Sequence, residues 1–287
     1  MNTKTSYHID QLRDYSTLFL RSEVNRWLNN DFKSIDLKIK RYDSSLIKND
    51  FNYLSYLKYI YKILEKHYPN EYIYKNEFLN KWLIKELGNS DSIIVNEFRI
   101  GKAIADLVMF NGTSRVFEIK TILDKEYRLT SQLLEYKKIF NEIYLIIPKS
   151  SFEKYSNYDN SIGIITYDSN IKDFYLFRKP IQNIEINSDS LMNVLHTNEY
   201  KEIVKDYYGE LPSMNDFTQF EICKELISNI PNEKLNKLFI KTVKKRKLNN
   251  VFFNNINNEL NQICLSLNLS NDQKTKLIEK LKSKIVY

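Results

Sequence analysis

The sequence predicts an α/β protein in which a mixed β-sheet is flanked along the chain by helical regions. Apolar residues recur every three or four positions near both ends, whereas from about residue 92 to 177 they alternate or form short runs. Turn signals rich in glycine and asparagine separate those short runs. Three regions are therefore expected: a helical N-terminal region at 1–70, a mixed core at 71–185, and a basic helical C-terminal region at 186–287.

The N-terminal region shows helical spacing over most of residues 9–68. Apolar residues from Leu54 to Leu64 mark one face of a helix over 51–67, and Pro69 should end it because proline cannot continue a helix. A further amphipathic helix is expected to begin at Asn76-Glu77. This second helix would lead into the core.

The first half of the core changes to a period of two. Residues 92–99, 103–110 and 115–121 are rich in Ile, Val and Phe. Asn111-Gly112 between the last two segments is a strong hairpin signal, because both residues tolerate the positive φ that tight turns require. The three segments should form an antiparallel meander.

The second half of the core returns to helical spacing at 127–140 and then reaches a nearly all-apolar segment at 142–147. That composition is typical of a strand buried on both faces in a parallel sheet. A hairpin of 163–167 with 174–177 should extend the sheet. From 189 onward, helical spacing continues to the end.

Composition excludes several classes of protein. With 43% hydrophobic residues, 21 Tyr, 16 Phe and only 5 Gly and 5 Pro, the chain should fold and cannot be collagen-like. Its apolar runs, such as 143–147, are far shorter than the roughly 20 residues of a membrane helix, and Met-Asn-Thr-Lys-Thr has no apolar signal core. Cys223 and Cys264 form no zinc or disulfide pattern. We expect a cytoplasmic protein without a membrane partner.

Motifs exclude further chemistry. The sequence contains no Walker loop, no GxGxxG and no G-x-S-x-G, and its three histidines, His8, His67 and His196, fall in different elements. Histidine triads, histidine metal sites and serine hydrolysis are therefore not expected. Carboxylate and lysine chemistry remains.

Charge is concentrated at the C-terminus. The net charge is +7; residues 221–287 hold 13 basic and 6 acidic side chains, whereas 61–220 hold 20 basic and 23 acidic ones. This balance permits nucleic acid as a partner. The densest basic run contains Lys244, Lys245, Arg246 and Lys247, which would either contact phosphates or form a solvated helix end.

Two neighbouring strands carry the candidate chemistry. Glu118 and Lys120 are two apart in a strand, so their side chains share a face, and Asp106 lies in the partner strand across the Asn-Gly hairpin. Two carboxylates converging between apolar strands are costly unless a cation neutralises them, and oxygen ligands favour Mg²⁺ or Mn²⁺. The alternative is a cross-strand ion pair without a metal.

The pattern resembles the PD-(D/E)XK nuclease superfamily, which has a restriction-endonuclease-like core. Asp106 precedes Glu118-Ile119-Lys120, and the element order α-β-β-β-α-β over about residues 75–148 is similar to that family's core. Gln132 and Tyr136 resemble a recurrent Gln-x-x-x-Tyr variant. Ala105 stands where the family usually has proline.

The resemblance implies metal-dependent cleavage of phosphodiester bonds. Asp106, Glu118 and the Ile119 carbonyl would hold Mg²⁺ or Mn²⁺, Lys120 would orient water, and Gln132 would position Lys120 or the phosphate. Glu77 matches the family's acidic residue in the leading helix and would be a further catalytic and metal-binding group.

Several of these residues have simpler interpretations. Gln132 can be a solvated residue and Tyr136 a core aromatic, while Glu77 can be a first-turn carboxylate favoured by the helix dipole, with Glu86 a competitor for its role. Glu97 could face the site from the first strand, but its phase is unresolved. These alternatives stay open on sequence grounds.

The function expected from the sequence is a Mg²⁺-dependent endo- or exodeoxyribonuclease that acts in defence against or processing of foreign DNA. A catalytically silent nucleic-acid-binding or interaction protein on the same scaffold is one alternative, and an RNA-processing nuclease is another. The sequence gives no oligomeric state.

Overall fold

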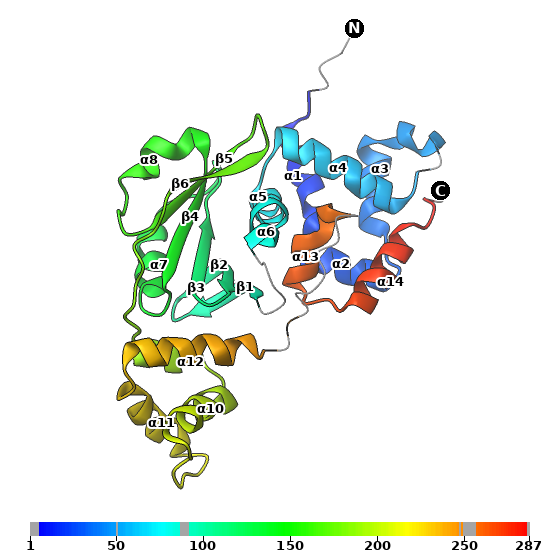
Figure 1. Ribbon diagram of the computed structural model, residues 1–287. Helices are drawn as coiled ribbons and strands as arrows, with labels where there is room; N and C mark the ends of the chain where they lie inside the picture. The colour runs from blue at the N-terminus through cyan, green and yellow to red at the C-terminus, as the bar shows by residue number, and fades with distance from the viewer. Residues whose placement is uncertain (1–5, 50, 87–91, 247, 249–256, 286–287) are drawn as a thin grey trace. The chain divides into compact units, whose positions relative to one another are not determined.

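The computed structural model describes residues 6–49, 51–86, 92–246, 248 and 257–285 of the chain (Figure 1). The chain forms two compact units, one of residues 1–84 with 249–287 and the other of residues 85–248. None of the helices in these described ranges has the length and apolarity that crossing a membrane requires.

The first unit is helical. Its helices are α1 (Ile9–Ser16), α2 (Arg21–Leu28), α3 (Lys33–Tyr42), α4 (Tyr53–His67), α5 (Glu71–Phe78), α13 (Asn261–Ser266) and α14 (Asn271–Leu281). Short turns are the 3-10 segments η1 (Thr17–Phe19), η2 (Ser44–Asn49) and η5 (Asn258–Leu260) and the π-helical η3 (Leu79–Leu83). The short helix α6 (Ile84–Glu86) spans the boundary between the two units.

Helix boundaries in this unit follow capping residues. The Asn52 side chain accepts a hydrogen bond from the Ser55 backbone N–H (2.8 Å) at the start of α4, which ends just before Pro69 as predicted. Asn70 caps α5 in the same way through the Ile73 N–H (3.1 Å). The prediction that this helix begins at Asn76-Glu77 was therefore wrong, because the Asn70 cap starts it earlier.

The second unit contains a mixed sheet of six strands in the order β1-β2-β3-β4-β5-β6. The strands are β1 (Ile93–Ile100), β2 (Ala103–Phe110), β3 (Ser114–Ile119), β4 (Glu142–Pro148), β5 (Gly163–Asp168) and β6 (Asp173–Arg178). β1, β2 and β3 form the antiparallel meander, β4 and β5 add in parallel, and β6 pairs antiparallel with β5. The predicted α/β class with a mixed sheet and helical flanks is confirmed.

The helices of the second unit pack around that sheet. They are α7 (Leu129–Tyr136), α8 (Phe152–Ser156) with η4 (Lys149–Ser151) before it, α9 (Ser188–Met192), α10 (Thr197–Tyr208), α11 (Gln219–Ser228) and α12 (Asn232–Lys244). α7 and α12 share one hydrophobic core with the strands: Leu133 and Tyr136 of α7 and Phe239 of α12 are buried in the same cluster as Phe110 and Val116. This core fixes α7 against β2 and β3.

The C-terminal helices divide between the two units. α9 to α12 join the core of the sheet, whereas Leu277 and Leu281 of α14 are buried in the cluster that contains Trp27 and Leu57. The three sequence regions follow a change in hydrophobic period, which identifies a helix but not the core that the helix joins. The two compact units are defined by which core each segment joins, so their boundaries differ from those of the three regions defined by hydrophobic period.

Candidate active site

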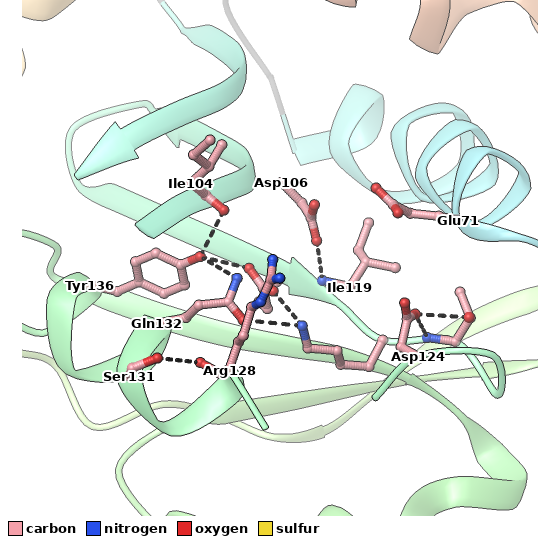
Figure 2. Close-up of polar contacts among 12 residues, drawn as sticks. Glu71, Ile104, Asp106, Ile119, Asp124, Arg128, Ser131, Gln132 and Tyr136 are labelled. Carbon is pink, nitrogen blue, oxygen red and sulfur yellow. Dashed lines mark hydrogen bonds and ion pairs between the residues drawn. The ribbon is translucent and has the colours of Figure 1, made fainter. Parts of the chain in front are cut away.

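Asp106 is positioned by a break in the pairing of β2 with β3. The ladder runs from Phe110↔Ser114 to Leu107↔Phe117 and stops there. Beyond that point, the Asp106 carboxylate takes over the role of a backbone acceptor, since its Oδ2 accepts a hydrogen bond from the Ile119 N–H at 2.8 Å (Figure 2). The side chain of one strand is thus fixed against the backbone of the next, beside Glu118.

A kink in β1 lies at the same level of the sheet. Asn96 pairs with Leu107 and Phe98 with Ala105, which leaves Glu97 opposite Asp106. The backbone of Glu97 has φ 55°, a left-handed conformation that is strained for a residue other than glycine and that recurs at functional sites. The Glu97 side chain is exposed.

The kink changes which residues of β2 face the core. Val108 and Phe110 lie in the hydrophobic cluster, and so do Ala103 and Ala105, although an undistorted strand buries only alternate residues on one face. The phase therefore switches at Asp106. Residue spacing in the sequence does not show where a strand changes the set of side chains that face the core. For this reason the sequence did not show which way Glu97 faces.

Glu118 lies on the face of β3 that packs against α7. Its side chain is 2% exposed, and both of its oxygens have partners. Oε1 accepts from the Lys120 Nζ at 2.7 Å, and Oε2 accepts from the Tyr136 hydroxyl at 2.7 Å. The Tyr136 oxygen also lies 3.1 Å from the Ile104 carbonyl oxygen of β2. The side-by-side placement of Glu118 and Lys120 agrees with the sequence prediction.

One stripe of α7 completes the arrangement. Gln132 Oε1 accepts from Lys120 Nζ at 3.2 Å, so the structure brings Gln132 to Lys120 as the resemblance implied. Tyr136 is one turn further along the same face, and Arg128, the N-cap residue, is one turn before. Figure 2 shows the Arg128 side chain rising beside Gln132. Sequence reasoning missed Arg128, which the spacing of four to Gln132 and again to Tyr136 could have revealed.

Burial sets the electrostatics of the site. It raises the pKa of the Glu118 carboxyl to about 7, and the nearby Asp106 charge acts in the same direction, while Lys120 opposes both. Burial and the Glu118 charge also raise the pKa of the Tyr136 hydroxyl, which therefore stays a neutral hydrogen-bond donor. Two neighbouring carboxyl groups with one ammonium beside them form a site that a further cation would stabilise.

The donor set suits a hard cation that keeps several waters. Within the described ranges, no three His, Cys, Asp or Glu side chains gather as a metal cluster. The protein ligands that the resemblance implies for magnesium or manganese are Asp106, Glu118 and the Ile119 carbonyl, and water would complete the shell of the ion. These oxygen donors, and the raised pKa of Glu118 beside Asp106, fit such an ion.

Glu77, the other predicted metal ligand, belongs to the first unit. Its Oε1 accepts from the Tyr61 hydroxyl at 2.6 Å, and its Oε2 forms an ion pair with Lys81 Nζ at 2.7 Å. Both carboxylate oxygens thus have partners within their own unit, and Glu77 would have to exchange one of them to bind an ion. Its competitor Glu86 pairs with Arg115 at 3.4 Å.

The predicted basic run serves partly to join helices. Arg246 binds both oxygens of Glu199 on α10, at 2.7 and 2.8 Å, and its guanidinium lies 5.5 Å from the centre of the Phe98 ring. Lys245 forms an ion pair with Glu202, also on α10. Arg246 is therefore a packing residue of the second unit. Lys247 lies outside the described residues.

Four lysines in and directly after α12 line a shallow concavity of about 400 Å³. It is lined by Gly112 at the turn between β2 and β3, by Ile240, Lys237, Lys241 and Lys244 of α12, and by Lys245 directly after that helix. Lys241 pairs with Asp206 at 2.8 Å. Gly112 precedes β3 and Lys120 follows it, so the concavity and the carboxylate site lie at opposite ends of this strand.

Comparison with known proteins gives three findings. The structure is similar to the SPO1766 protein of unknown function from Silicibacter pomeroyi, with 10% identity, a TM-score of 0.32, and coverage of 48% of this chain and 93% of that one. Protein cII of Enterobacteria phage P4 is 26% identical over 173 residues, which are 58% of this chain and 64% of that protein. The chain thus spans under two thirds of that relative. The Bacteriophage P4 protein cII family matches residues 65–269, so the chain belongs to this family.

Proposed function

We propose that the chain is a metal-dependent nuclease of the PD-(D/E)XK type that cleaves DNA in the cytoplasm, in processing of foreign DNA or defence against it. One observation carries the proposal. At one point of the sheet, Asp106, Glu118 and Lys120 converge, and Gln132 and Tyr136 of α7 hold Lys120 and Glu118 in place.

The contacts assign a role to each group. Lys120 Nζ is held between Glu118 and Gln132, where its positive charge would orient a water molecule and offset the charge of a phosphate. Tyr136 fixes the other Glu118 oxygen, so the carboxylate cannot rotate without breaking a buried hydrogen bond. A bound magnesium or manganese ion would supply Lewis-acid activation of the phosphate and of water.

A catalytically silent nucleic-acid-binding protein is the second candidate. It is favoured by the completeness of the network, since both Glu118 oxygens and one Asp106 oxygen have protein partners without any ion. Such a network is stable as an ordinary buried polar cluster. Only a measurement of cleavage separates the two candidates.

The test uses the full chain with DNA or RNA in magnesium, manganese or chelator. Asp106→Asn, Glu118→Gln and Lys120→Met should each lower the rate of DNA cleavage at least about 100-fold, because each preserves shape and removes a charge from the site. Glu142→Gln is the matched control: Glu142 is also a strand carboxylate paired with a cation, Arg115 at 2.8 Å, but it lies at the other end of the strands.

Three outcomes would contradict the proposal. A wild-type rate of DNA cleavage by the Glu118→Gln variant would rule out a mechanism that depends on this carboxylate. DNA binding without cleavage in either metal would favour the silent binding protein, and cleavage of RNA alone would favour an RNA-processing nuclease.

A further inference from the structure

The loop that joins Lys120 to α7 has an ordered base. The Asp124 carboxylate accepts hydrogen bonds from the Thr121 N–H at 2.7 Å and the Thr121 hydroxyl at 2.8 Å, and the Leu123 N–H donates to Thr121 Oγ1. At the far end, the Leu129 N–H donates to the Glu126 carbonyl at 2.8 Å. These contacts hold residues 121–128 in a defined shape beside the site.

This loop presents apolar side chains to solvent. Ile122 is 63% exposed, Leu123 is 51% exposed and Tyr127 is 71% exposed. Ile122 follows Lys120 by two residues, so their Cα atoms are at most about 7.6 Å apart. Single exposed apolar residues are common, but three within one short pinned loop next to a polar site indicate a binding surface.

The acidic side chains of the loop have partners within the protein, and its other two charged side chains are positive. Asp124 is engaged in capping, and Glu126 forms an ion pair with Lys154. The Arg128 guanidinium lies 5.0 Å from the centre of the Tyr127 ring, and within the described part of the chain neither Arg128 nor Lys125 has an ion pair. An aromatic ring under a guanidinium, with a second cation nearby, complements a base next to its phosphates.

We propose that the loop at 121–128 binds single-stranded DNA, with Tyr127 stacking on an unpaired base and Ile122 and Leu123 contacting the next bases. Arg128 and Lys125 contact the adjoining phosphates. The inference rests on the proposed function, because it places this strand beside the catalytic site. It goes further by assigning the substrate class: DNA with unpaired bases at the point of cleavage, in preference to intact duplex.

The first experiment measures binding in chelator, so that cleavage plays no part. Fluorescence anisotropy compares a labelled single strand, the matching duplex and an RNA of the same sequence. We expect tighter binding of single-stranded DNA than of duplex, and Tyr127→Ala should weaken single-strand binding about 5- to 150-fold, the range of one base stacked on an aromatic ring. Duplex binding should be unchanged.

Two control variants separate stacking from general effects. Tyr127→Phe keeps the ring and should bind as the wild type does. Tyr175→Ala removes another exposed tyrosine, 48% exposed on β6, and should also bind normally. A strand carrying 2-aminopurine should show fluorescence quenching by the wild type and by Tyr127→Phe, but not by Tyr127→Ala.

The inference and the proposed function fail in different ways. Cleavage of DNA together with unchanged single-strand binding by Tyr127→Ala would overturn the stacking loop and leave the nuclease intact. Tyr127-dependent single-strand binding without any cleavage would leave the loop and overturn the nuclease. Equal affinity of the wild type for duplex and single strand, or binding of RNA alone, would also overturn the inference.

Discussion

Replacing Glu118 by glutamine tests the electrostatics of the candidate site directly. Glutamine has nearly the same shape but cannot ionise. Its one amide oxygen can still accept from Lys120, while its NH2 group can donate to the Tyr136 oxygen, whose O–H can turn to the Ile104 carbonyl 3.1 Å away. In the wild type, burial and the Asp106 charge raise the pKa of Glu118 from 4.5 to about 7. The folded state therefore holds this proton over a pH range in which the unfolded chain has lost it.

The sign and size of the effect follow from this difference in pKa. The protonated carboxyl contributes its full stability below pH 4.5, and this contribution is lost as the pH rises through about 7. Each tenfold change in proton affinity corresponds to 1.36 kcal/mol, so the loss is on the order of 3 kcal/mol. Between pH 5 and pH 8, the wild type should lose about 2 to 3 kcal/mol relative to Glu118→Gln.

The assay must report on the second unit. The two tryptophans, Trp27 and Trp82, lie in the first unit, so their fluorescence is unsuitable. Hydrogen exchange of the β3 amides, which gives the free energy of local opening, is the appropriate measurement. Ile119 is the key reporter because its N–H donates to Asp106.

Magnesium provides the second arm of this test. At pH 8, added magnesium should restore protection of the wild-type β3 amides, since an ion that binds only the folded state stabilises it, and should have little effect on Glu118→Gln. Identical pH profiles of the wild type and Glu118→Gln would refute the assigned electrostatics. A magnesium response in both proteins would place the ion elsewhere.

Three further predictions concern neighbouring parts of the second unit. Tyr136→Phe leaves a Glu118 oxygen without its 2.7 Å donor, so the free energy of unfolding should fall by about 1 to 3 kcal/mol in urea titrations followed by circular dichroism, while Tyr175→Phe should not change it. Arg246→Leu removes the guanidinium that binds both oxygens of the buried Glu199 carboxylate, which then keeps only His196 as a partner among the described residues, and should lower stability by about 3 kcal/mol, whereas Lys237→Leu, at an exposed ion pair, should alter it by less than about 1 kcal/mol. Neutralising Lys244, Lys245 and Lys247 together, with Arg246 kept because it pairs with Glu199, should weaken DNA binding and reduce its salt dependence by up to about 0.9 log unit for each phosphate that the protein no longer neutralises, with turnover at saturating DNA retained; an unchanged salt slope would show that these lysines contact no phosphate.

Strand positions could be predicted because they depend on local patterns. The segment 103–110 coincides with β2, and the Asn111-Gly112 turn forms the predicted hairpin, with Gly112 at φ 96°. The apolar segment at 142–147 pairs in parallel with β3, as its composition indicated. Once these strands are in register, the alternation of side chains places Glu118 and Lys120 together.

Long-range packing could not be predicted in the same way. The sequence contains the helical spacing of α12 and α14, but not the information that Phe239 joins the core of the sheet while Leu277 joins the core of the N-terminal helices. The pairing of Arg246 with Glu199 was hidden for the same reason, since a basic run on a helix looks alike whether it meets solvent or another helix. Both depend on tertiary contacts between segments far apart in the chain.

The atoms that the proposed reaction would need also hold the fold of the candidate site together, which determines how the site can be tested. Asp106 replaces a missing backbone acceptor of the β2–β3 ladder, and the Lys120 N–H extends the β3–β4 ladder to the Ile146 carbonyl while its Nζ neutralises Glu118. Alanine at Asp106 or Glu118 would therefore leave a donor without its partner, a loss of about 1 to 3 kcal/mol that is independent of any reaction. Loss of activity in such a variant could not be assigned to chemistry. Asparagine at Asp106 keeps an acceptor for the Ile119 N–H. Glutamine at Glu118 keeps an acceptor for Lys120, and the Tyr136 hydroxyl can donate to the Ile104 carbonyl instead. A loss of cleavage in these variants with intact β3 protection would therefore report on the lost charge.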